Sequence, residues 1–235
     1  MKLRMQITKD KDIRFISHLE YVRTIERAIR RAKLPAAYSE GFNPHMKFAL
    51  ASALGVGVVS YTEFVEIELK EPVPVEAAAR ALDKALPRGI RVLEADAVDT
   101  HHAALMAQAA GAAYRVTLDY TRDISAAVAS FNAAASLPFK KAAPKLKEKF
   151  KEVDVKFYIP ELAVETRGEE TIFSFDIKIT QQGSMKAVDL LNALNEAYEL
   201  ELPVERADIE RLRLYRLDGK GNRLPMLGAN KVKIV

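Results

Sequence analysis

Cysteine is absent from the 235 residues of this sequence. The chain therefore forms no disulfide bond, and its own side chains supply no thiolate nucleophile, iron–sulfur cluster or cysteine-based zinc site. Apolar runs are also short, since none approaches the roughly 18 residues of a membrane-spanning helix. The first 14 residues are charged and lack a hydrophobic signal region. We therefore expect a cytoplasmic protein without a membrane association.

Several catalytic signatures are missing as well. The sequence contains no GxxxxGK[ST] loop, GxGxxG fingerprint, HExxH helix or GxSxG elbow, so nucleotide, serine or zinc hydrolysis lacks support. The pair His101-His102 lies in an alanine-rich stretch without metal-ligand spacing, and we predict that both side chains are exposed. We expect no metal and no cofactor, and we favour a role other than that of an enzyme.

The hydrophobic pattern predicts two halves with the same order of elements. In the first half we expect strands at 2–8, 46–52, 62–69 and 91–95, and helices at 17–32 and 75–86. In the second half we expect strands at 114–120, 152–165, 171–179 and 209–216, and helices at 124–135 and 185–198. The pattern predicts an α+β fold of tandem ferredoxin-like (βαββαβ) units with antiparallel sheets. The expected boundaries are 1–100 and 113–218, with a basic C-terminal tail at 219–235.

Positive charge is concentrated in three segments although the net charge is only +4. Residues 1–35 contain ten Lys and Arg against four acidic residues, residues 139–156 seven against three, and residues 211–235 seven against one. Such clustering is typical of a surface that binds a polyanion, because each neutralised phosphate releases counterions. The alternative is a set of solvated faces that never meet in space.

The first expected helix has a cationic face. Arg23, Arg27 and Arg30 follow i, i+4, i+7 spacing with Arg31 alongside, opposite the apolar stripe. The planar arginine side chain suits phosphate oxygens and stacks on bases. The alternative is a solvated face, or one paired with acidic residues elsewhere.

The segment YSEGFNPHMK, residues 38–47, is the most site-like part of the sequence. Its glycine and its Asn-Pro pair predict a turn that is surrounded by aromatic rings, a histidine and a lysine. Flat rings beside positive charge are typical of single-stranded RNA recognition. The alternative is that the two rings belong to the core and the histidine caps a turn. The candidate contact residues are Tyr38, Phe42, Asn43, His45 and Lys47.

Other candidates lie outside this segment. His18 and His45 could exchange protons as a general acid and base, because the pKa range of histidine permits both roles. Lys140, Lys141 and Lys145 belong to a lysine-rich stretch that we expect to form a mobile hairpin or loop for phosphate contact, or merely for solubility. Arg211 and Arg213 would share one sheet face with Tyr215 in a regular final strand.

The paired motifs RFISHLE and YSEGFNPHMK strongly resemble the bacterial radical SAM-linked protein family, a domain of unknown function. The resemblance continues through EVDVKFYI at 152–159 to the strand IERLRLYRL. Members are fused to, or encoded beside, a radical SAM protein, often near genes for ribonucleases and ribosomal proteins. The resemblance thus implies a radical SAM partner and an RNA context, but no established activity. The matching positions are Arg14, Phe15, His18, Tyr38, Ser39, Gly41, Phe42, Asn43, His45 and Lys47.

These observations favour a non-catalytic RNA-binding or substrate-presenting module that serves a radical SAM enzyme. Tandem ferredoxin-like units with a basic face are also similar, in fold alone, to CRISPR repeat-processing endoribonucleases and pseudouridine synthases. One alternative is a metal-independent RNA-processing enzyme that uses His18 and His45. Another is a protein–protein scaffold for the radical SAM partner, whose arginines dock an acidic surface without RNA.

Overall fold

The computed structural model describes residues 1–99, 103–143 and 147–235, which form two compact units. The first unit comprises Met1–Ala110 and Arg213–Val235, and the second comprises Gly111–Leu212. The chain therefore leaves the first unit once and returns to it. Strand β10 (Asp208–Leu217) contributes residues to both units.

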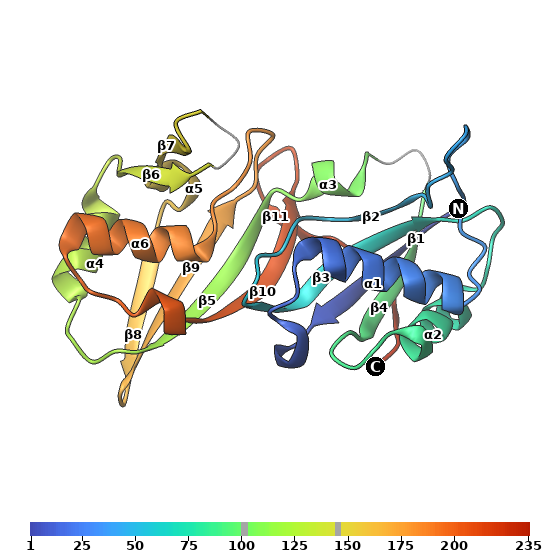
Figure 1. The fold of residues 1–235 in the computed structure, drawn as a ribbon, viewed down its shortest axis with the longest axis horizontal. Helices are drawn as coiled ribbons and strands as arrows, with labels where there is room; N and C mark the ends of the chain where they lie inside the picture. Colours follow the sequence, from blue (N-terminus) through green and yellow to red (C-terminus); the bar gives the residue numbers. More distant parts are fainter. Residues whose placement is uncertain (100–102, 144–146) are drawn as a thin grey trace. The chain divides into compact units, whose positions relative to one another are not determined.

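The first unit is an antiparallel sheet with helices (Figure 1). Its elements are β1 (Lys2–Lys9), η1 (Lys11–Ile13), α1 (His18–Arg31), β2 (Phe48–Leu50), β3 (Val58–Glu68), α2 (Val75–Ala85), β4 (Val92–Val98), α3 (Leu105–Gln108), β11 (Arg223–Pro225) and β12 (Val232–Lys233). The strand order is β12-β4-β1-β3-β10, with β2 also paired to β3 and β11 to β10. The order β1-α1-β2-β3-α2-β4 agrees with the hydrophobic pattern of this half.

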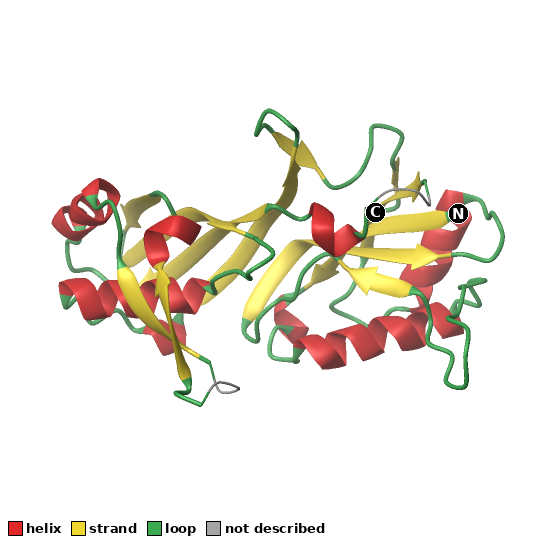
Figure 2. Ribbon diagram, turned by 90° about the horizontal axis from the view of Figure 1, so that it is seen from above, coloured by secondary structure: helices red, strands yellow, loops and turns green. Residues whose placement is uncertain are grey.

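Alternation along β1 determines which sheet face becomes the core. Leu3, Met5 and Ile7 are buried in one cluster with apolar residues of α1 and α2, so both helices cover the same face. Figure 2 shows α1 as the long red helix that runs along the strands of this unit. Ser17 is the N-cap of this helix; its hydroxyl accepts the Glu20 N–H, while the Glu20 carboxylate accepts the Ser17 N–H. This capping box stabilises the first turn.

The second unit is a smaller antiparallel sheet in the order β10-β5-β9-β8, accompanied by a separate β6-β7 hairpin. Its elements are β5 (Gly111–Asp119), α4 (Ser125–Ala133), β6 (Pro138–Ala142), β7 (Phe150–Asp154), α5 (Val155–Tyr158), β8 (Leu162–Arg167), β9 (Glu170–Lys178), α6 (Ala187–Tyr198) and η2 (Val204–Arg206). The whole chain is thus a mixed α/β protein with mostly antiparallel strands.

The single strand expected at 152–165 is wrong. The segment instead contains the end of β7, the helical turn α5 and the start of β8. The carboxylate of Asp154 accepts N–H bonds from Lys156 and Leu137, which begins the helical turn and interrupts the strand. Residues on both sides still alternate in hydrophobicity, and this is why the pattern predicted a continuous strand.

Residues 219–235, which we expected to form a basic tail, are integrated into the first unit. The backbone N–H of Ile234 donates to the Leu93 carbonyl, and β12 pairs antiparallel with β4. Lys231 forms an ion pair with Glu94 at 2.6 Å, and the Gly228 N–H donates to Asp96. The exposed edge of β4 therefore gains both backbone and charge partners.

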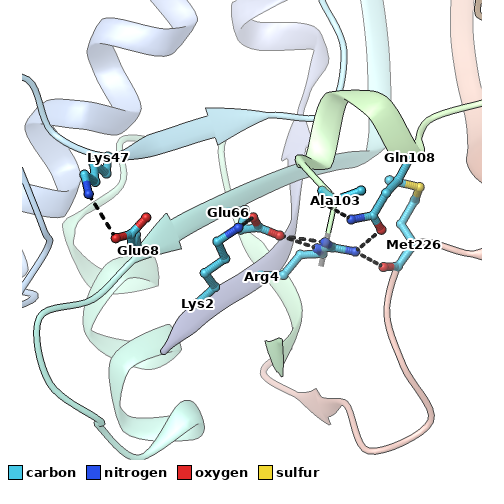
Figure 3. A network of polar contacts seen from close by, with 8 residues as sticks. All are labelled: Lys2, Arg4, Lys47, Glu66, Glu68, Ala103, Gln108 and Met226. Carbon is cyan, nitrogen blue, oxygen red and sulfur yellow. Dashed lines mark hydrogen bonds and ion pairs between the residues drawn. The ribbon is translucent and has the colours of Figure 1, made fainter. Parts of the chain in front are cut away.

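A buried arginine holds this returning segment against the sheet (Figure 3). The Arg4 guanidinium, only 4% exposed, binds Glu66 through two nitrogens at 2.6 and 3.0 Å. The same group donates to the Gln108 side chain at 3.1 Å and to the Met226 carbonyl at 2.8 Å. One side chain thus joins β1 to β3, to α3 and to the C-terminal segment.

In the described part of the chain, no helix is long and apolar enough to cross a membrane.

Candidate functional site

Helix α1 presents a row of arginines on its outer face. Its inner face buries Tyr21 and Ile25, and this places Arg23, Arg27 and Arg30 on the exposed side. Neither Arg23 nor Arg27 forms a hydrogen bond or ion pair with another residue that the structure describes. Both guanidinium groups therefore keep their donors for a ligand.

The last turn of α1 is more constrained. Arg30 forms an ion pair with Glu26 at 2.6 Å, and Arg31 donates to the Ala85 carbonyl at 2.8 Å. A hydrogen bond with the Tyr38 hydroxyl, together with the charge of Glu26, raises the pKa of the Arg30 guanidinium above its ordinary value. The C-terminal end of the row is thus fixed in position and permanently charged.

The loop at 38–47 follows the C-terminal end of α1 and has an ordered base (Figure 1). Tyr38 pairs with Met46 in an antiparallel bridge, and the Ser39 N–H donates to the His45 carbonyl at 2.8 Å. The His45 N–H in turn donates to the Ser39 hydroxyl at 2.9 Å. Gly41, at φ +116°, provides the left-handed conformation that the turn requires.

The tip of the loop carries the most exposed aromatic ring among the described residues, Phe42, whose relative exposure is 112%. Asn43 and His45 are exposed beside it, whereas Met46 is buried and anchors the base. The alternative that Phe42 belongs to the core is therefore wrong. A single exposed apolar residue is ordinary, but a fully exposed ring at the tip of a turn with an ordered base is available as a contact surface.

Cationic side chains surround the base of the loop. The Lys70 ammonium lies 5.7 Å from the centre of the Tyr38 ring, and Lys47 forms an ion pair with Glu68 at 3.2 Å (Figure 3). Because Tyr38 also contacts Arg30, the structure brings the helix row and the loop together, as the sequence could only suggest. The sequence did not indicate Lys70 as a site residue, because this lysine follows the end of β3 and belongs to no motif or cationic cluster.

The opposite end of α1 carries a second exposed ring. Phe15 is 69% exposed, and the Arg14 guanidinium lies 4.9 Å from its ring centre. The Arg14 carbonyl accepts hydrogen bonds from the Gly57 N–H and from the ammonium of Lys9, each at 2.8 Å. Lys9 is only 1% exposed and also donates to the Gly55 carbonyl. Sequence reasoning missed Lys9, because a lysine at a strand end ordinarily points into solvent.

The two candidate acid–base histidines lie at opposite ends of α1. His18 is the first residue of the helix, whereas His45 is held by Ser39, directly beside Tyr38 and hence near Arg30. The helical rise separates the His18 and Arg30 positions by about 18 Å. Direct proton exchange requires roughly 3 Å between heavy atoms. The structure does not bring His18 and His45 together.

The lysine-rich stretch of the second unit is only partly available to a ligand. Lys140 is exposed on β6 opposite Glu152. Lys141 donates to the Ser184 carbonyl at 2.7 Å and pairs with Asp189 at 3.2 Å, so it has a structural role. Lys145 lies outside the described residues, as do His101 and His102.

The basic row expected on the final strand does not form. Arg211 is 1% exposed and Tyr215 is 6% exposed, whereas Arg213 is exposed. The Arg223 guanidinium covers the Tyr215 ring at 4.8 Å, because β11 folds back along β10. The expectation assumed a regular strand, whereas burial along β10 does not alternate at this point: Leu212 and Arg213 are both exposed, and Leu214 and Tyr215 are both buried. Within the described residues, no group of three or more His, Asp or Glu side chains could hold a metal ion.

The fold and these surfaces define a mixed α/β protein with an exposed face of arginines flanked by aromatic rings. Residues 2–189 match the model of the uncharacterized proteins conserved in bacteria known as DUF2344, and the chain belongs to this family. No curated protein matches the sequence.

Two solved structures resemble the chain at low sequence identity. The first is a chain of the crystal structure of a Cbf5-Nop10-Gar1 complex, with 12% identity and a TM-score of 0.50. That match covers 92% of this chain and 50% of the other, so this protein spans about half the length of that chain. The second is an unknown protein from Galdieria sulphuraria, with 14% identity, a TM-score of 0.25, and 88% and 95% of the two chains covered. The first similarity concerns the fold alone.

Proposed function

We propose that this protein is a non-catalytic RNA-binding module that presents RNA to a radical SAM enzyme. The observation that carries the proposal is the outer face of α1, where Arg23 and Arg27 have unused donors beside a loop that projects Phe42 into solvent. Guanidinium groups bind phosphate oxygens through paired hydrogen bonds, and exposed rings stack on bases. Arginines beside exposed rings suit RNA better than an acidic protein surface, because an acidic surface would be bound by the arginines without the rings.

The architecture is consistent with this role. In the first unit the strands follow the order β4-β1-β3-β2, and in the second they follow β10-β5-β9-β8. We therefore interpret both as ferredoxin-like βαββαβ units, with β6, β7 and α5 inserted into the second. Such units carry helices on one sheet face, and in the first unit that helical layer supplies the proposed RNA contacts.

The radical SAM partner is proposed from the motif resemblance in RFISHLE and YSEGFNPHMK. Because this chain contains no cysteine, the iron–sulfur cluster would be held by the partner. The distance between His18 and His45 supports a binding role for this chain, with the chemistry carried out by the partner. His45 then contributes a polar contact beside Phe42.

Filter binding of RNA over a salt series tests the proposal. Affinity should fall steeply with salt, and Arg23→Ala and Arg27→Ala should each reduce the slope of log K against log salt by about one unit or less. Arg167→Ala is the matched control, because Arg167 is an exposed arginine of the second unit that pairs with Glu165. Absence of RNA binding, or binding that does not respond to salt, would favour the scaffold alternative.

A further inference from the structure

Two exposed phenylalanines bracket the arginine row. Phe15 lies just before Ser17, the N-cap of α1, and Phe42 lies at the tip of the loop that follows the helix. The helix between them has 14 residues and therefore extends about 21 Å. A ligand that contacts both rings must span about this length, and the exposed Arg23 and Arg27 lie between the two ends of the helix.

The backbone segments that carry the two rings are held in place before any ligand binds. The Phe15 segment is fixed by the hydrogen bonds that Lys9 and Gly57 donate to the Arg14 carbonyl. The loop of Phe42 is closed by the backbone and hydroxyl bonds between Ser39 and His45. Because this backbone is already ordered, stacking of a base on either ring costs the entropy of the side chain alone.

The surface between the rings is concave. A depression of about 400 Å³ is lined by Ile16, Glu20, Arg23, Thr24 and Arg27. Hydrogen bonds from the backbone and hydroxyl of Ser17, together with the charge of Arg23, lower the pKa of the Glu20 carboxyl, so Glu20 carries a negative charge in the depression. Two arginines against one carboxylate leave the lining with a net positive charge, and the planar guanidinium groups suit phosphate.

We propose that this face selects single-stranded RNA of about four nucleotides or more, with separate bases stacked on Phe15 and Phe42 and the intervening phosphates on Arg23 and Arg27. This inference rests on the proposed function and specifies its substrate. In a duplex the bases stack on one another and present mainly backbone and groove edges, so neither ring would find a base face. A surface that binds phosphates alone would need the arginines but not the rings.

Fluorescence anisotropy with a labelled octanucleotide, and with a duplex of the same length at the same salt concentration, tests the selection. The single strand should bind more tightly, and Phe15→Ala and Phe42→Ala should each weaken it about 5-fold to 100-fold. The two losses should multiply in the double variant, because the 14-residue helix α1 separates the rings and each contacts a different base. Phe157→Ala is the matched control, since Phe157 is 49% exposed in the second unit.

A direct readout is also possible because the chain contains no tryptophan. Phe15→Trp and Phe42→Trp each introduce a single indole that preserves a stacking surface, so binding should persist and the emission should be quenched when a base stacks. Binding of the single strand without any change in either emission would overturn the inference. Equal duplex affinity with unaffected alanine variants would also overturn it while leaving the proposed function intact. Failure of both RNAs to bind would overturn both proposals.

Discussion

Removal of the Arg4 side chain should destabilise the first unit more than any exposed substitution. The guanidinium is almost completely buried and joins Glu66, Gln108 and the Met226 carbonyl. Arg4→Met leaves the Glu66 carboxylate buried, with only the weaker pair to Lys2 at 3.3 Å. Loss of one partner from a buried ion pair costs about 3–5 kcal/mol, because the remaining charge is no longer compensated.

The second part of the experiment removes both charges. Arg4→Met combined with Glu66→Gln should recover about 1–3 kcal/mol of that loss, because no buried carboxylate then remains without its guanidinium. The free energy of unfolding is best measured by hydrogen exchange of the β1 and β3 amides, which reports on this unit alone. A cost below about 1 kcal/mol for Arg4→Met, or no recovery in the double variant, would refute the argument.

Three further predictions concern the pH dependence of stability, the Phe15 segment and the loop. Burial raises the pKa of the Asp83 carboxyl, but hydrogen bonds from Arg91 and from the Val92 N–H outweigh this effect and lower it overall. The stability that these bonds provide is fully present above the unfolded pKa of about 3.9 and is lost as pH falls through the lower pKa of the folded state. The melting temperatures of the parent and of Asp83→Asn should therefore differ at neutral pH and converge in acid. Lys9→Met should destabilise the first unit by about 1–3 kcal/mol, because the Gly55 carbonyl loses a charged donor; urea denaturation with no measurable change would contradict this. His45→Ala and Lys47→Ala should change folding stability by no more than about 0.5 kcal/mol while weakening RNA binding; if both variants melt much earlier than the parent, the loop has a structural role instead.

The helices and strands of the first unit were largely predictable because their signals are local. Alternation in β1, the Ser17 capping box and the helical spacing of the arginines each involve residues fewer than about ten apart. The outward direction of Arg23 and Arg27 follows from the same helical period. The arginine row of the candidate site was therefore predictable from the sequence.

The remainder depended on contacts between residues far apart in the chain. Nothing near Lys9 or Arg211 indicates that these cations are buried, since burial of a charge depends on partners supplied by other elements. Likewise, the contact between Tyr38 and Arg30 depends on how the loop returns after α1. The hairpin and helical turn inserted in the second unit were hidden because their alternation resembles that of one long strand.

The return of the chain to the first unit has a consequence for the order of events during synthesis. Segments that emerge first from a ribosome can fold first, but here β4 must wait for β12, at Val232–Lys233, to cover its edge. Arg4 likewise acquires its Met226 acceptor only after the 222 residues that follow it have been translated. Until then the charged side chain of Arg4 on β1 lacks one of its partners, and an open strand edge remains available to other nascent chains.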